Sequence, residues 1–193
     1  MVRSLLDKGV EVIACDVCTD EVDSRAVRKI LNFFDLPEGN VFEKLGSPDV
    51  CLHMAWRNGF VHNAPTQMGD LSAHYRFLAA LIDGGLKQLA VMGTMHEVGY
   101  WEGAIDENTP CNPISMYGIA KDALRRSMIL YARQKSVVFR TAVRCQYNGM
   151  AMCHTAGIYL ESGPCLPGRR SRRKRSRRKQ YFRLLQARIS MIL

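Results

Sequence analysis

Residues 87–99, KQLAVMGTMHEVG, and residues 112–121, NPISMYGIAK, decide the fold of this chain. The apolar run at residues 89–92 ends at Gly93 and Thr94 and suits a buried parallel strand, although a buried helix can look the same. Ligands in open α/β sheets bind outside the carboxyl ends of the strands. The polar residues that follow the run are therefore candidates for a functional site.

Tyr117 and Lys121 lie about one helical turn apart, which places both side chains on the same helix face. An ammonium group beside a phenol favours the phenolate, so we expect Lys121 to lower the pKa of Tyr117. Thr94, at the mouth of the strand, could offer a hydroxyl to the same reacting oxygen. Together the three groups predict a proton-transfer site.

These motifs resemble those of the extended short-chain dehydrogenase/reductases, in particular the NAD-dependent epimerase/dehydratase group that acts on nucleotide sugars. Residues 117–121 match the family's Tyr-x-x-x-Lys, preceded by Asn-Pro at 112–113, and residues 94–99 match its Ser/Thr segment. Residues 53–56, HMAW, resemble its His-x-Ala motif after an apolar strand. One Tyr-x-x-x-Lys alone occurs by chance in many helices, but several motifs in this order are more specific. The resemblance covers roughly residues 1–140.

The resemblance implies a catalytic role for each residue of the proton-transfer site. Tyr117 would take a proton from a sugar hydroxyl while hydride passes to NAD. Lys121 would lower the pKa of Tyr117 and bind the nicotinamide ribose, so that both residues also contact the cofactor. Thr94 would hold the substrate hydroxyl.

The resemblance also implies cofactor-binding residues at two other strand ends. Asp16 closes an apolar strand, where the family places an acid that binds the adenosine ribose, and this acid favours NAD over NADP. The alternative is that Asp16 is a simple turn residue. His53 and Ala55 would line the cofactor groove, although a histidine in such a position is more often structural.

The predicted fold class is α/β, a partial Rossmann-like doubly wound parallel sheet with helices between the strands. Helices are expected over residues 71–84 and 116–132, and over residues 25–34. On the helix at residues 116–132, we expect Arg125, Arg126 and Arg133 to lie on the polar side and to be solvated. The strands are expected near residues 10–15, 49–54, 88–93 and 136–140.

The start of the chain departs from a complete dinucleotide-binding domain. Such a domain opens with a strand, a glycine-rich turn and a helix N-terminus that binds the pyrophosphate. Residues 2–8 are instead typical of the end of a helix, and the first six glycines form no G-x-x-G-x-x-G. We therefore expect an N-terminally truncated sheet that lacks its first strand and glycine-rich turn.

The C-terminal part leaves the family pattern. We predict an incomplete NAD(P)-binding Rossmann-like domain over residues 1–140 and an irregular, frameshifted or disordered tail over residues 141–193. Residues 169–179, RRSRRKRSRRK, hold nine basic residues in eleven, a composition typical of disordered segments that bind polyanions. Nuclear targeting and nucleic-acid contact are alternatives to a shifted reading frame.

Composition limits the class of protein. Of the 193 residues, the first 168 carry 16 Lys/Arg and 18 Asp/Glu, whereas the last 25 carry 11 Lys/Arg and no acid, so the net charge of +9 comes from the tail. The seven cysteines show no disulfide spacing, and the lone C-x-x-C at Cys15 and Cys18 fits reduced thiols better than a metal or redox site. No apolar run approaches the roughly 20 residues that span a bilayer. We expect a cytoplasmic protein.

Two functions remain open at this point. The first is an NAD-dependent epimerase/dehydratase-type oxidoreductase acting on a nucleotide sugar, impaired by its missing parts and compatible with a homodimer. The second is a non-catalytic chain whose basic tail binds nucleic acid. No aromatic residue interrupts the basic run, which weakens the second function.

Overall fold

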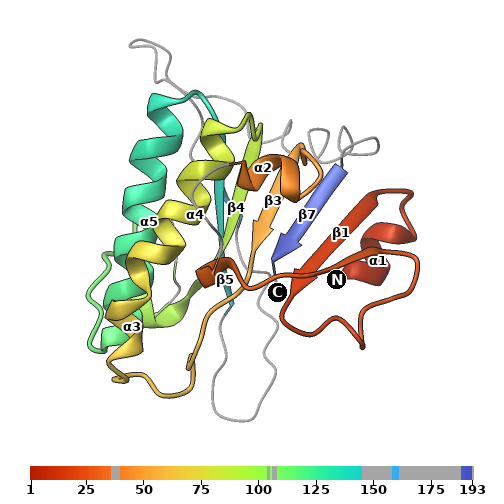
Figure 1. The fold of residues 1–193 in the computed structure, drawn as a ribbon. Helices are drawn as coiled ribbons and strands as arrows, with labels where there is room; N and C mark the ends of the chain where they lie inside the picture. Colours follow the sequence, from red (N-terminus) through yellow and green to blue (C-terminus); the bar gives the residue numbers. More distant parts are fainter. Residues whose placement is uncertain (36–39, 104, 106–107, 145–157, 161–187, 193) are drawn as a thin grey trace.

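A computed structural model of the chain describes residues 1–35, 40–103, 105, 108–144, 158–160 and 188–192, and these residues form one sheet covered by helices (Figure 1). The sheet has seven strands in the order β2-β1-β7-β3-β4-β5-β6. All neighbouring strands run parallel except β5 and β6. The strands are β1 (Glu11–Asp16), β2 (Val27–Ile30), β3 (Val50–His53), β4 (Gln88–Thr94), β5 (Val138–Arg144), β6 (Ile158–Leu160) and β7 (Arg188–Ile192).

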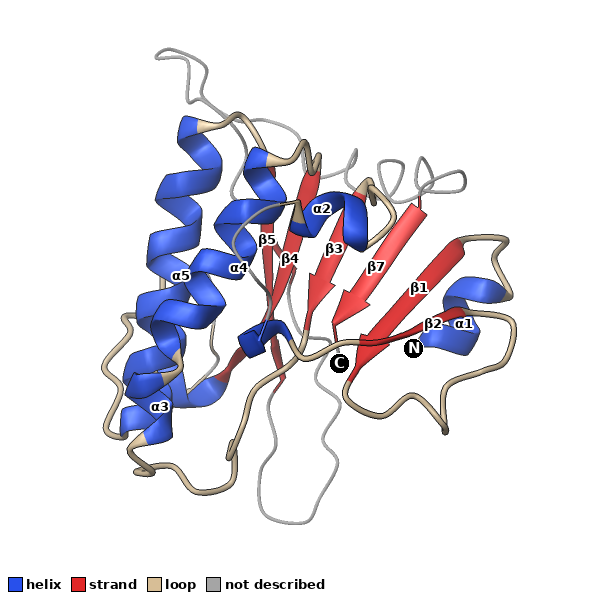
Figure 2. Ribbon diagram, in the orientation of Figure 1, coloured by secondary structure: helices blue, strands red, loops and turns tan. Residues whose placement is uncertain are grey.

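Two long helices lie side by side against the sheet, as Figure 2 shows. They are α4 (Leu71–Asp83) and α5 (Met116–Gln134). Within the described part of the chain, neither these helices nor any other has the length and apolarity that crossing a bilayer requires. The shorter elements are α1 (Val2–Leu6), α2 (Val41–Lys44), α3 (Thr66–Gly69) and the 3₁₀ helices η1 (Phe33–Asp35) and η2 (Met95–Glu97).

Alternate residues of the strands point into two apolar clusters, one on each face of the sheet. Along β1, Ile13 and Cys15 enter the main core with residues of α4 and α5, whereas Val12 enters a smaller cluster next to α1. Strands with both faces covered are typical of parallel sheets, and this explains the continuous apolar runs in the sequence. The predicted α/β class with a doubly wound parallel sheet is confirmed, and so are the four predicted strands.

The prediction of a helix over residues 25–34 is wrong. Residues 27–30 form the edge strand β2, which pairs in parallel with β1 from Ile13↔Val27 onward. This strand is largely exposed, so its sequence shows no apolar face that distinguishes a strand from a helix. Pairing with the buried strand β1 outweighs the helix propensity of its arginine and lysine.

The range 141–193, for which we expected no regular structure, contributes to the sheet. β5 continues to Arg144, and β6 and β7 both fall in this range. β7 takes a central place between β1 and β3 rather than an edge. The basic run at residues 169–179 lies outside the described residues.

A pair of histidines is buried beside the aromatic part of the main core. His53 Nε2 and His74 Nδ1 lie 2.9 Å apart, and both side chains are fully buried. The Trp56 ring stacks on His74 with a centroid distance of 4.3 Å. Burial lowers the pKa of both histidines, to about 3 for His74. The pair is therefore neutral at physiological pH.

We expect this pair to make the fold sensitive to acid. Below about pH 6.5 the unfolded chain binds protons on both histidines while the native state does not, so the free energy of unfolding falls as the pH drops. His74→Asn keeps a polar atom near His53 Nε2 but cannot titrate. Urea unfolding between pH 4 and 7 should show a slope that is smaller than that of the wild type by up to about 1.4 kcal/mol per pH unit.

Ser72→Asn, at an exposed position on the same helix as His74, is the matched control because it neither adds nor removes a titratable group. It should keep the wild-type slope. Identical slopes for wild type and His74→Asn would contradict the buried neutral pair.

Candidate active site

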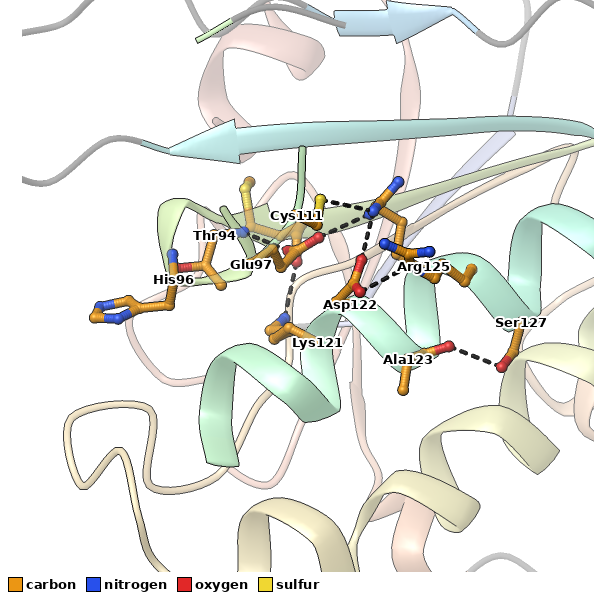
Figure 3. Close-up of polar contacts among 11 residues, drawn as sticks. Thr94, His96, Glu97, Cys111, Lys121, Asp122, Ala123, Arg125 and Ser127 are labelled. Carbon is orange, nitrogen blue, oxygen red and sulfur yellow. Dashed lines mark hydrogen bonds and ion pairs between the residues drawn. The ribbon is translucent and has the colours of Figure 1, made fainter. Parts of the chain in front are cut away.

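The end of β4 is fixed by a capping box. The Thr94 hydroxyl accepts a hydrogen bond from the His96 backbone N–H at 3.3 Å, and Glu97 Oε1 accepts one from the Thr94 N–H at 2.7 Å (Figure 3). Both bonds satisfy donors at the start of η2, which would otherwise lack partners. The chain therefore turns sharply after β4 and holds Thr94 at the carboxyl edge of the sheet.

The first turn of α5 packs directly against this turn. Ser115 caps α5 by accepting the Gly118 N–H at 3.2 Å. A Cβ atom on Gly118 would clash with the carbonyl oxygen of His96, so only glycine allows this close approach. The approach brings Tyr117 and Lys121 to the end of β4.

The structure brings the three predicted catalytic residues together. The Thr94 side chain lies close enough to the Tyr117 phenol to affect its pKa. Lys121 is 3% exposed, donates from Nζ to the Met92 carbonyl oxygen at 2.8 Å and lies 4.3 Å from the centre of the Trp56 ring. A phenol, a hydroxyl and an amine around one strand end can bind and move the proton of a substrate hydroxyl.

The electrostatics of the site differ from the sequence-based expectation. Burial raises the pKa of Tyr117. The Thr94 side chain opposes this shift, and the charge on Glu97 adds to it. The groups that shift the Tyr117 pKa are Thr94 and Glu97, whereas the Lys121 ammonium group donates to the Met92 carbonyl oxygen. Burial lowers the pKa of Lys121 itself to about 8. The expectation that the pKa of Tyr117 is lowered toward neutral is therefore wrong, because burial raises it.

An ion-pair network that the sequence did not reveal lies behind the site. Arg125 Nε contacts Glu97 Oε2 at 2.9 Å, and Arg125 Nη2 contacts Asp122 Oδ1 at 2.5 Å and Cys111 Sγ at 3.1 Å (Figure 3). Glu97 is only 2% exposed, and burial raises its pKa while Thr94 and Arg125 oppose that shift. We expected Arg125 to be solvated, and that prediction is wrong. The Thr-x-x-Glu spacing at residues 94–97 is the signal that could have revealed the network.

Two further histidines border the phenol. The His62 ring lies 4.1 Å from the His96 ring and stacks on Tyr117 with a centroid distance of 5.7 Å and an interplanar angle of 13°. The Tyr117 N–H donates to the His62 carbonyl oxygen at 2.8 Å. Burial, followed by the charge of His62, lowers the pKa of His96. Nothing in the sequence spacing indicated His62, which comes from a long loop.

Asp16 lies in a separate cleft at the end of β1. The cleft has a volume of about 970 Å³, and its lining includes Asp16, Met54 and residues of α1. The Asp16 carboxylate is partly exposed and accepts the Val17 N–H at 2.6 Å, which leaves its other oxygen for a ligand. The position suits a ribose diol.

The structure places the other two expected cofactor-binding residues differently. His53 is fully buried against His74, and its place beside the cofactor stays a prediction. Ala55 is half-buried and packs against the main core, and its N–H donates to the Ile192 carbonyl oxygen at 3.1 Å. The described residues include no cluster of three His, Cys, Asp or Glu that could hold a metal ion.

Comparison with known proteins connects this geometry to one family. Residues 1–149 match the NAD dependent epimerase/dehydratase family. The chain is 39% identical over 140 residues to the dTDP-6-deoxy-L-talose 4-dehydrogenase (NAD(+)) of Aggregatibacter actinomycetemcomitans, which covers 68% of this chain and 50% of that protein.

The fold is similar to those of solved epimerases. The UDP-glucose 4-epimerase of Thermotoga maritima, solved with UDP-glucose, has a TM-score of 0.59 at 20% identity, covering 74% of this chain and 49% of that one. The UDP-glucuronic acid 4-epimerase of Bacillus cereus, solved with NAD, has a TM-score of 0.56 at 18% identity, covering 72% and 50%. The chain thus spans about half the length of these relatives.

The buried amine of Lys121 should leave a signature in alkaline stability. Its pKa is about 8 in the native state and 10.5 in the unfolded chain, so between these values the unfolded state binds more protons and stability rises with pH. The rise amounts to about 3 kcal/mol at most. Lys121→Met should remove it from the free energy of unfolding measured between pH 8 and 10.5.

Lys8→Met, at an exposed position, serves as the control and should retain the wild-type rise. A Lys121→Met profile parallel to that of the wild type would mean that the amine is solvated.

Proposed function

This chain belongs to the NAD-dependent epimerase/dehydratase family, and we propose that it takes part in hydride transfer between NAD and a hydroxyl-bearing carbon of a nucleotide sugar. The observation that carries the proposal is the meeting of Thr94, Tyr117 and Lys121 at the end of β4. The names of the relatives, which include NAD(+), UDP-glucose and dTDP-6-deoxy-L-talose, support this substrate class. A cytoplasmic location and a homodimer belong to the same proposal, and light scattering would test the homodimer.

The residues present fit two parts of NAD, whose nicotinamide ring accepts hydride when it is bound. Asp16, in its open cleft, suits the adenosine ribose, and Lys121 with Tyr117 would hold the nicotinamide ribose. The backbone at Ala55 would border the cofactor. The described residues contain no glycine-rich turn after a strand, so the proposal assigns no contact to the pyrophosphate.

In this proposal Tyr117 exchanges a proton with the sugar hydroxyl, and Thr94 orients that hydroxyl. Because burial raises the pKa of Tyr117, the phenol is protonated at neutral pH and the phenolate fraction grows as the pH rises. Proton abstraction from the sugar should therefore be faster in alkaline solution. The His62 ring lies nearly parallel to the phenol and borders it on one side.

The proposal predicts a specific pattern of activity loss. Tyr117→Phe and Thr94→Val should each lower kcat about 10²- to 10⁴-fold, because each removes a group that touches the transferred proton. Thr94→Ser should restore most of the activity. The full chain is assayed with labelled dTDP-6-deoxy-L-talose and with labelled UDP-glucose. The assay measures NADH formation and identifies the sugar products.

Tyr131→Phe is the matched control, because Tyr131 lies on the same helix and its hydroxyl contacts Asp83 rather than the site. It should retain wild-type activity. Equal activity in wild type and Tyr117→Phe would exclude the proposed role of the phenol.

A second candidate function, nucleic-acid binding, is favoured by the charge of residues 169–179 alone. If the run binds RNA, replacing its nine basic residues with glutamine should abolish filter retention, and retention by the wild type should fall steeply as salt rises. Retention that survives the replacement would assign RNA binding to another surface.

A further inference from the structure

The centre of the sheet is formed by a segment outside the family match. The match ends at residue 149, whereas β7 spans residues 188–192. β7 nevertheless pairs in parallel with both neighbours, with Ile189 opposite Val12 and Val50. A strand paired on both sides is an integral part of a sheet rather than an addition to its edge.

The strand order shows which place β7 fills. Dinucleotide-binding sheets have the order 3-2-1-4-5-6, and ligands bind where that order reverses, beside strand 1. Here β2, β1, β3, β4 and β5 correspond to strands 3, 2, 4, 5 and 6, and β7 stands in the position of strand 1. We propose that the C-terminal segment 188–192 serves, within the same molecule, as the central strand that completes the nucleotide-binding edge.

Packing on both faces supports this role. Ile189 is 6% exposed and joins the smaller cluster with Val10, Val12 and Val50. Ile192 is 2% exposed and joins the main core on the opposite face. A slip of one residue would reverse both side chains, so the two isoleucines specify one register.

The amino end of β7 is anchored by polar contacts. Arg188 donates its N–H to Asp49 Oδ2 at 3.2 Å, and the Asp49 N–H donates to the Arg188 carbonyl oxygen at 2.9 Å. The Arg188 guanidinium contacts Glu11 Oε1 at 3.1 Å and the Gly46 carbonyl oxygen at 2.9 Å. These contacts join β7 to β1 and to the segment before β3 in the same register as the isoleucines.

The carboxyl end of β7 reaches the candidate site. The Ile192 carbonyl oxygen accepts the Met54 N–H at 2.7 Å and the Ala55 N–H at 3.1 Å. Met54 lines the cleft that contains Asp16, and Trp56, two residues further on, covers the Lys121 amine. β7 thus holds the segment after β3 that connects the cleft to the proton-transfer site.

Hydrogen exchange of the full-length wild-type chain tests the proposal directly. The amides of residues 189–192, together with those of Met54 and Ala55, should exchange about a hundredfold or more slowly than in urea, as for other core strands. Size-exclusion chromatography with light scattering identifies the species measured. Protection that persists in the monomer, after dilution has dissociated any dimer, is the expected result.

Rapid exchange of residues 189–192 would overturn the proposal. Protection that appears only in a dimer would overturn it as well, since the strand would then come from a second copy. This readout needs no NAD and no activity, so it can fail or succeed independently of the proposed function.

Cysteine labelling provides a second measurement. Cys15 and Cys51 are fully buried beside β7, in register with Ile192 and Ser190, whereas Cys18 is exposed. Ile189→Asp should increase the maleimide labelling rate of Cys15 and Cys51 at least about tenfold relative to Cys18, because a buried charge displaces the strand. Ile30→Asp, at a position that is 78% exposed on β2, is the control and should leave both rates unchanged. Unchanged rates in Ile189→Asp would refute the central position of β7.

Discussion

The buried carboxylate of Glu97 is the contact on which the candidate site depends. One oxygen accepts the Thr94 N–H at the end of β4, and the other contacts Arg125 on α5. A buried carboxylate is costly unless both oxygens are satisfied, and removing either partner would leave a charge without compensation. The network therefore holds β4 and α5 in one relative position.

That position also explains why glycine stands at residue 118 and why Lys121 is buried. The helix approaches the turn after β4 so closely that Gly118 has no room for a Cβ. One helical turn later, the same approach places the Lys121 amine against the face of the Trp56 ring, where it donates a hydrogen bond to the Met92 carbonyl oxygen. The low pKa of the lysine follows from this burial, and the high pKa of Tyr117 follows from its half-buried position beside Glu97.

Local sequence patterns predicted the parts of this structure that local physics determines. Buried parallel strands give continuous apolar runs, and the spacing of Tyr117 and Lys121 placed both on one helix face. Patterns could not predict burial that depends on tertiary contacts. The side chain of Arg125 contacts Glu97, which is 28 residues away in the sequence, and His53 contacts His74, which is 21 residues away.

The same reasoning explains why β7 could not be expected. The five residues of β7, with two buried isoleucines, show no clear strand period, and a parallel pairing leaves no hairpin signal nearby. Only the order of the other strands shows that a strand parallel to both β1 and β3 is needed between them. Unpaired backbone groups at the centre of a sheet are costly. The interior position is therefore filled by β7, a short apolar segment from a distant part of the chain. The segment after β3 is then fixed by the strand that fills that position, so the geometry of the cleft depends on the last strand of the chain.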